Sequence, residues 1–372
     1  MSHIINRVFS RLILLSIISL SFFLTSCDWG ERIDQKVELT PMSFSELSGW
    51  NKDDSRHALI AFSRSCQKLI SYNGCEKQNS AIYLDCDEMK EICLRLPADL
   101  SRVSKTTAKD FFEDNFTPYK VADARTGEIG TFTGYYQPSI FGSKYKTRQF
   151  TAPIYSRPND LVNGRPYLTR AQIENYGLKG KSQILYWTHP VDLFDLQIQG
   201  SGILKLNDGT NIQIGYAGNN GHEFQSVSKA MKQRGMRPSE GFTAQGVLKF
   251  LKKQNKTTLT QLLQSNPRYI FYKQNGVGPI GSLGVVLTPQ RSLAVDRSYI
   301  PLGVPIFLNT TAKGYEFKKL LMAQDTGSKI LGAVRGDVYW GTGKNALEWA
   351  GKMKNDGTYY VLLPKNSLAS YK

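Results

Sequence analysis

The stretch that decides the fold runs from Ala323 to Gly343 and reads AQDTGSKILGAVRGDVYWGTG. It holds two acidic residues, Asp325 and Asp337, in a glycine-rich and mostly uncharged setting. Asp325 ends an apolar run that reads as a strand, and Asp337 opens a second strand-like run. A glycine-rich connection between two such runs can place both carboxylates on one wall of a groove.

These two aspartates have two readings. Aspartate beside glycine is common in turns, where it has only a structural role. Carboxyl groups beside apolar side chains also suit glycoside cleavage, in which one of them must stay protonated to pass a proton to the leaving oxygen. The neighbours Val338, Tyr339 and Trp340 would disfavour the charged form of Asp337 and so raise its pKa.

Working outward, the N-terminus reads as a bacterial lipoprotein signal over residues 1–26. Arg7 and Arg11 precede the apolar run LILLSIISLSFFL, which is too short to span a bilayer, and LTSC follows. We expect Cys27 to become the lipidated first residue of the mature protein, followed by a tether over 27–40. The alternative is an ordinary signal peptide with a chance cysteine.

The remaining four cysteines lie within 28 residues, and an even number in an exported chain indicates disulfides, with three possible pairings. These candidates are Cys66, Cys75, Cys86 and Cys93. A zinc site is the rival, but there is no Cys-x-x-Cys pair and the four histidines are scattered, so we expect no metal.

The net charge is +16, and because the leader holds two arginines and no acid, +14 remains on the mature chain. Such a surplus favours a polyanionic partner, although a solvated basic surface explains it equally well. Export and the lack of a DNA- or RNA-binding motif argue against nucleic acid. Anionic cell-wall polymer or membrane headgroups fit better.

Two helical stretches are predicted in the N-terminal part. SELSGWNKDDSRHALIAFSRSCQKLI is amphipathic, and Asp53 or Asp54 can cap it. AKDFFEDNFTPYKV reads as a second short helix, broken at Pro118.

From Gly130 onward the chain consists mainly of short β-rich runs separated by turn residues, among them LFDLQIQGSGILKL. Asp208 and Gly209 mark a hairpin, helical patterns lie near 223–234 and 243–254, and β-rich runs resume near 269. This pattern predicts a mainly β protein with short helices, built on barrels rather than a doubly wound sheet.

Five segments occur in the same order as in a known family: SFSELSGW, FTGYYQP, YAGNNGHEF, LTPQRSLAVDRSYIPLGVPIFL and AQDTGSKILGAVRGDVYWGTG. From about residue 40 to its end the chain resembles the membrane-bound lytic murein transglycosylase A family. The resemblance implies a double-psi β-barrel built from 41–137 and 265–372, with a second β domain, 138–264, inserted. A groove between them would hold the glycan strand.

The resemblance also assigns roles. The family's catalytic aspartate falls on Asp337 and its companion on Asp325. The implied reaction cleaves the MurNAc–GlcNAc β-1,4 bond of peptidoglycan and leaves 1,6-anhydro-MurNAc ends, with Asp337 as both acid and base and with no cofactor. A hydrolytic muramidase, or a non-catalytic peptidoglycan-binding module, is the alternative.

Candidate substrate-binding residues combine aromatic rings, which offer flat apolar faces to sugars, with hydroxyl and amide groups, which bond sugar hydroxyls. They are Thr133, Tyr135, Tyr136, Gln199 and Ser201. The tyrosines could instead belong to the barrel core.

The chain departs from the family pattern at two places. Ser328 stands where family members usually have glycine, and Asp195 stands where they usually have an aromatic residue. We expect Ser328 to be harmless, and Asp195 to be a solvated position on a strand rather than an altered contact.

The expected location is the periplasm, with a lipid anchor in the outer membrane and a monomeric chain. Asp28, directly after Cys27, resembles an inner-membrane retention signal and points the other way.

Overall fold

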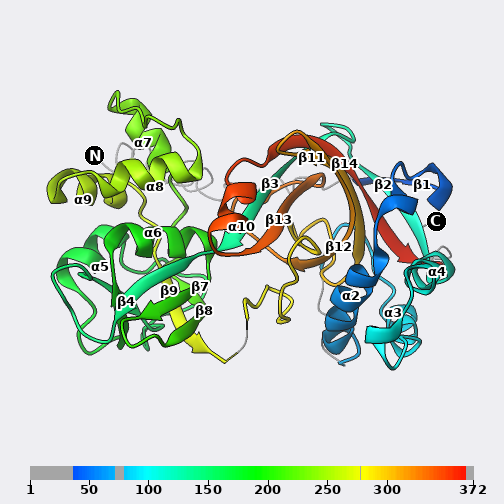
Figure 1. Ribbon diagram of the computed structural model, residues 1–372, viewed down its shortest axis with the longest axis horizontal. Helices are drawn as coiled ribbons and strands as arrows, with labels where there is room; N and C mark the ends of the chain where they lie inside the picture. The colour runs from blue at the N-terminus through cyan, green and yellow to red at the C-terminus, as the bar shows by residue number, and fades with distance from the viewer. Residues whose placement is uncertain (1–36, 72–78, 277, 366–372) are drawn as a thin grey trace, which may run out of the picture. The chain divides into compact units, whose positions relative to one another are not determined.

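The computed structural model describes residues 37–71, 79–276 and 278–365, which form two β-sheets with helices packed against them (Figure 1). The predicted class, mainly β with short helices and with a barrel and a second β domain, is confirmed. The leader over 1–26 and Cys27 lie outside the described residues. The expected tether over 27–40 overlaps the first strand, because Val37–Pro41 pairs with Phe116–Asp123.

Among the described residues, eight strands make the first sheet. In sheet order they are β1 (Val37–Pro41), β2 (Phe116–Asp123), β14 (Lys354–Pro364), β11 (Pro305–Ala312), β12 (Tyr315–Asp325), β10 (Ser292–Val295), β13 (Arg335–Thr342) and β3 (Gly130–Gln137). The sheet closes on itself because the long strand β14, which lies between β2 and β11 in this order, also pairs with β3 at the far end. Its start pairs with β3 and its middle pairs with β11.

Two of the strand pairs in the barrel are parallel. Strand β10 runs parallel to β12, and β13 runs parallel to β3, which comes from the N-terminal part of the chain. In Figure 1 the cyan β3 lies among the orange and red C-terminal strands. Gly134 on β3 allows a close approach, because a Cβ there would lie 2.5 Å from Trp340 Nε1.

Six further strands make the second sheet, again counting only the described residues. In sheet order they are β5 (Ala152–Tyr155), β6 (Ile184–Thr188), β4 (Ser139–Ser143), β7 (Gly202–Leu206), β8 (Asn211–Asn219) and β9 (Ile270–Asn275). Strands β7 and β8 form the hairpin predicted at Asp208-Gly209, where Gly209 has φ +83°. Because β9 pairs with β8, this sheet continues to Asn275, beyond the return to the barrel expected at 265.

The helices of the inserted part are α5 (Arg170–Tyr176), α6 (Pro190–Gln199), α7 (Val227–Gln233), α8 (Ala244–Lys252) and α9 (Lys256–Gln264). Helices α7 and α8 match the two predicted patterns. The stretch LFDLQIQ was predicted as a strand, and this is wrong because it belongs to α6. His189 caps that helix by accepting from Val191 N, and Pro190 occupies its first turn, where a missing N–H costs nothing.

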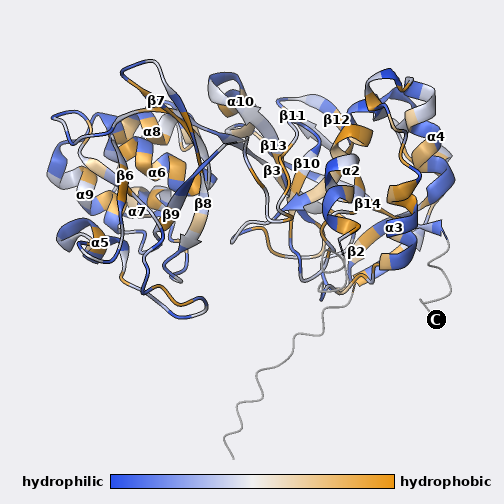
Figure 2. Cartoon of the chain, turned by 90° about the horizontal axis from the view of Figure 1, so that it is seen from below, coloured by the Kyte–Doolittle hydropathy of each residue, from blue (hydrophilic) through white to orange (hydrophobic). Residues whose placement is uncertain are grey.

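The N-terminal helices are α2 (Ser55–Leu69), α3 (Cys86–Leu94) and α4 (Lys105–Asn115), and α10 (Gly343–Ala350) follows β13. Asp54 caps α2, as predicted, by accepting from Arg56 N. The prediction that Pro118 breaks the second helix is wrong: α4 ends at Asn115, and Pro118 lies within β2. Figure 2 shows hydrophobic residues of α2 and α3 beside the barrel strands, with which they share one core.

Cys66 on α2 and Cys93 on α3 form a disulfide that joins these two helices. Cys86 is also disulfide-bonded, and Cys75 lies outside the described residues.

A buried ion pair fastens the start of α2 to the barrel. Arg291 donates to both carboxylate oxygens of Asp53, at 2.6 and 2.8 Å, and to the carbonyls of Asp54 and Leu320. Asp53 also accepts from Leu320 N at 2.9 Å. Both side chains are nearly inaccessible to water, so each needs the other to remain charged there.

We expect Asp53→Ala to destabilise the fold by about 3–5 kcal/mol, because it leaves Arg291 charged and unpaired in the interior. Asp54→Ala is the matched control at the next position, and it should cost only about 1 kcal/mol through loss of the helix cap. Urea unfolding of both variants measures the difference. Equal losses would contradict a special role for the Asp53–Arg291 pair.

Candidate active site

The register of β3 against β13 places Thr133 opposite Asp337. Thr133 Oγ1 donates to Asp337 Oδ1 at 2.7 Å. Among the described residues, Thr133 is the one hydrogen-bond donor to the Asp337 carboxyl. Arg335 Nη2 donates in turn to Thr133 Oγ1 at 2.8 Å, and Arg335 Nη1 donates to the carbonyl of Thr131. The arginine therefore directs the threonine proton toward Asp337.

The surroundings of Asp337 favour its protonated form. Burial raises the pKa of Asp337 to about 6, the hydrogen bond from Thr133 and the charge of Arg335 oppose this rise, and the nearby Asp325 adds to it. The side chain is only half-buried, so it can still meet a ligand in the groove. A carboxyl in this state can donate a proton near neutral pH.

Asp325, at the end of β12, is held very differently. Its Oδ1 accepts from Ser282 N, Ser282 Oγ and Thr326 N at 2.9 to 3.0 Å, and its Oδ2 accepts from Tyr135 Oη at 2.8 Å. Burial raises the pKa of Asp325, while these donors pull it down. Because so many donors already occupy its oxygens, this carboxylate is suited to fixing neighbours in place rather than to attacking a substrate.

A groove of about 620 Å³ brings most of the sequence-predicted residues together. Its lining includes Asp337, Asp325, Tyr135, Gln199 and Ser201. Thr133 reaches the site through its bond to Asp337, and the Tyr135 ring packs against Tyr339 at 5.3 Å between centroids. Ser328, the departure expected to be harmless, also lines the groove.

Tyr136 does not line this groove. Successive residues of a strand point to opposite faces, so Tyr135 and Tyr136 on β3 cannot both face the groove. Tyr136 is buried, its hydroxyl donates to Asp195, and its backbone N–H donates to Gln199 Oε1 at 3.2 Å.

The expectation for Asp195 is also wrong. It lies on helix α6 rather than on a strand, and it is buried rather than solvated. Burial raises the pKa of Asp195 to about 6, against the hydrogen bond from Tyr136. This carboxyl therefore connects the inserted part to β3 through Tyr136.

Sequence reasoning missed several groove residues. Ser282 lies in a glycine-rich turn that reads as a strand, and Arg335, although it lies within the quoted segment 323–343, was given no role. Tyr216, Arg268 and Lys273 belong to the inserted part and line the same groove. The alternation of residues along its strand could have indicated that Tyr216 faces the groove. Nothing in the sequence distinguishes Arg268 and Lys273 from ordinary surface cations.

Within the described ranges, no group of three or more His, Cys, Asp or Glu side chains is arranged to hold a metal ion. In the same ranges, no helix has both the length and the hydrophobicity needed to cross a bilayer.

The structure combines a closed barrel, a second β domain and a groove that holds a half-buried aspartic acid, and this combination defines a class of two-domain proteins. Comparisons with known proteins identify the family within that class. Residues 131–273 match the MltA specific insert domain, and residues 291–363 match the 3D domain. The crystal structure of MltA from Neisseria gonorrhoeae is 32% identical, with a TM-score of 0.74, over 88% of this chain and 93% of that one. The chain belongs to the membrane-bound lytic murein transglycosylase A family, so the resemblance seen in the sequence is confirmed.

Two other relatives agree. The membrane-bound lytic murein transglycosylase of Agrobacterium tumefaciens has a TM-score of 0.79 at 28% identity, over 90% of this chain and 100% of that one. Membrane-bound lytic murein transglycosylase A of Vibrio cholerae is 32% identical over 249 residues, which are 63% of this chain. That alignment spans 66% of the Vibrio protein, just under two thirds of its length.

We expect Asp337→Asn to stabilise the fold at pH 8, on the order of 1 kcal/mol, and to have little effect at pH 4. The folded-state pKa of about 6 exceeds the unfolded value, so the ionised carboxylate is a cost that is complete above pH 6 and absent below the unfolded pKa. Thermal unfolding at both pH values measures it, with the exposed Asp356→Asn as control. A variant less stable than the parent at pH 8 would favour the turn-residue reading.

Proposed function

We propose that this protein is a lytic transglycosylase that cleaves the MurNAc–GlcNAc β-1,4 bond of peptidoglycan and forms 1,6-anhydro-MurNAc ends. The observation that carries the proposal is the state of Asp337, a half-buried carboxyl that faces the groove with its pKa raised to about 6. The protein's membership of the family and the groove around the Asp337 carboxyl support peptidoglycan as the substrate.

In the first step Asp337 acts as the general acid. It passes its proton to the glycosidic oxygen, the bond from C1 of MurNAc to that oxygen breaks, and the GlcNAc side leaves as an alcohol. Thr133, held by Arg335, keeps one oxygen of the carboxyl fixed, so the other oxygen is left to face the substrate.

In the second step the same carboxylate acts as the base. It takes the proton of the C6 hydroxyl of MurNAc while that oxygen bonds to C1 and closes the anhydro ring. Because the attacking group belongs to the substrate, its effective concentration is high and no second enzyme nucleophile is needed. Asp337 ends the cycle protonated, as it began, and no water is added.

The role of Asp325 separates this reaction from hydrolysis. A muramidase needs a second carboxylate that attacks the sugar or activates water. The oxygens of Asp325 are instead occupied by Ser282, Thr326 and Tyr135. We assign Asp325 to holding Tyr135 in place and, through its negative charge, to raising the pKa of Asp337.

We expect Asp337→Asn to bind murein strands but to lose activity by more than about 10⁴-fold, because acid and base functions at one residue are both removed. Mass spectrometry of products from purified murein is the measurement. If the parent enzyme releases hydrolysed ends, which are one water heavier than anhydro ends, the protein is a hydrolytic muramidase instead. Near-normal product release by a folded Asp337→Asn protein would remove the catalytic assignment.

The pH dependence of kcat/KM provides a second test. The active form carries a protonated Asp337, so activity should fall about tenfold per pH unit above pH 6. In Asp325→Asn the like charge is gone, so we expect a residual activity whose fall begins at lower pH. An unchanged profile in that variant would show that Asp325 does not tune Asp337.

We further propose that Cys27 is lipidated and holds the enzyme in the periplasm, at the outer membrane, as a monomer. The sequence order of arginines, apolar run and LTSC supports this, as do the membrane-bound relatives. Cys27 lies outside the described residues.

We expect Cys27→Ala to yield unprocessed or soluble protein, because no acyl chains can be attached. Membrane fractionation with metabolic labelling by a fatty acid measures it. A processed variant that still partitions fully into membranes would argue against the lipid anchor.

A further inference from the structure

The groove around Asp337 carries an excess of positive charge. Besides Arg335, which is engaged with Thr133, its lining includes the cations Arg268, Lys273 and Lys329. None of these three forms an ion pair with a carboxylate among the described residues, whereas exposed lysines elsewhere, such as Lys252 with Asp192, do. Three cations without a carboxylate partner beside one glycan-sized groove leave charge available for a ligand.

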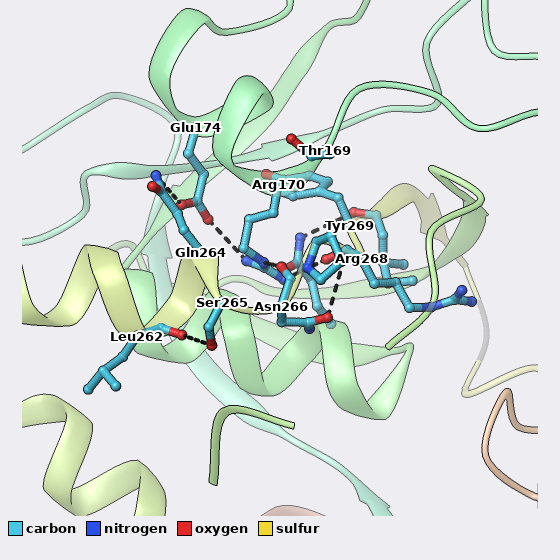
Figure 3. Close-up of polar contacts among 12 residues, drawn as sticks. Thr169, Arg170, Glu174, Leu262, Gln264, Ser265, Asn266, Arg268 and Tyr269 are labelled. Carbon is cyan, nitrogen blue, oxygen red and sulfur yellow. Dashed lines mark hydrogen bonds and ion pairs between the residues drawn. The ribbon is translucent and has the colours of Figure 1, made fainter. Parts of the chain in front are cut away.

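Arg268 is held in place by buried polar contacts. Arg170, which is 1% exposed, donates through Nε to the carbonyl of Asn266 and through Nη2 to the carbonyl of Arg268, at 3.1 Å each (Figure 3). The side chain of Asn266 accepts from the N–H groups of Gln225 and Arg268. The backbone that carries Arg268 is therefore fixed from two sides.

The guanidinium of Arg268 keeps most of its donors free of protein partners. Among the described residues it donates through Nη1 to the carbonyl of His222 at 3.0 Å, out of five available N–H groups. Lys273, on β9, is exposed and also lines the groove, as does Lys329, which follows the Asp325 turn on the barrel side. A planar guanidinium with free donors suits two-point binding of a carboxylate.

Apolar side chains complete this lining. Tyr216 and Ile198, each 47% exposed, and Ile280, 39% exposed, lie in the same groove. Exposed apolar faces contact the faces of sugar rings, and the cations beside them can reach the acidic substituents of those sugars.

We propose that Arg268, Lys273 and Lys329 form a carboxylate-binding subsite that recognises the acidic substituent of MurNAc. This inference rests on the proposed function, which supplies the substrate. The carboxylate can come from the lactyl group of a peptide-free MurNAc or from an attached stem peptide, and both present the same chemistry to these cations. The subsite makes MurNAc-containing strands better ligands than neutral GlcNAc oligomers.

The test measures equilibrium binding in the Asp337→Asn background, where no cleavage consumes the ligand. A variant carrying Arg268→Gln, Lys273→Gln and Lys329→Gln is compared with a control of equal charge loss, Lys205→Gln, Lys229→Gln and Arg234→Gln. The control residues are exposed, belong to the inserted part and lie outside the groove lining. The probes are a GlcNAc hexamer, murein strands stripped by an amidase, and peptide-bearing strands.

We expect the groove variant to bind carboxylate-bearing strands about 10-fold more weakly and with less salt dependence, while binding of the GlcNAc hexamer is unchanged. Weakening on stripped strands assigns the lactyl carboxylate, and weakening on peptide-bearing strands alone assigns the peptide. Equal weakening on the hexamer, no weakening on any probe, or the same loss in the control variant would overturn the proposal. The anhydro or hydrolysed nature of the parent's products decides the proposed function separately.

Discussion

The parallel pairing of β3 with β13 is the constraint on which the site depends. It joins two segments about 200 positions apart, and its register sets Thr133 opposite Asp337. Side chains alternate along a strand, so a slip by one residue would turn Asp337 into the barrel core and bring Val338 to the groove. The buried faces of both strands, which contribute Phe132 and Val338 to one core, make that slip costly.

Asp325 and Asp337 have identical side chains, but their different surroundings suit them to different roles. Burial raises the pKa of Asp325, but donors from Ser282, Thr326 and Tyr135 oppose that rise by stabilising the carboxylate. Asp337 receives one hydrogen bond from the described residues, and its partial burial raises its pKa to about 6, which favours its protonated form. A carboxyl that is costly to ionise in the folded state is useful for proton transfer, and such sites commonly trade stability for activity.

Local alternation and turn residues report on local structure, so the sequence allowed the barrel strands and the hairpin at Asp208-Gly209 to be predicted, whereas the roles expected for Asp325 and Asp337 came from the family resemblance. It failed at LFDLQIQ, where an alternating pattern belongs to a capped helix with Asp195 buried against Tyr136. There, tertiary contacts override the local pattern. The opposite facing of Tyr135 and Tyr136 was predictable from strand geometry, but the anchoring of Arg268 by Arg170 depends on a fold that places distant segments together.

The insertion between β3 and the rest of the barrel also orders the events of folding. As the chain is synthesised from its N-terminus, β3 appears long before β13 and β14, so the barrel cannot close until nearly all of the chain has been made. The second sheet, from β4 to β9, has its pairings within one continuous segment and can form earlier. Asp337 therefore meets Thr133 only when synthesis is nearly complete, and an incomplete chain holds no assembled Thr133–Asp337 pair.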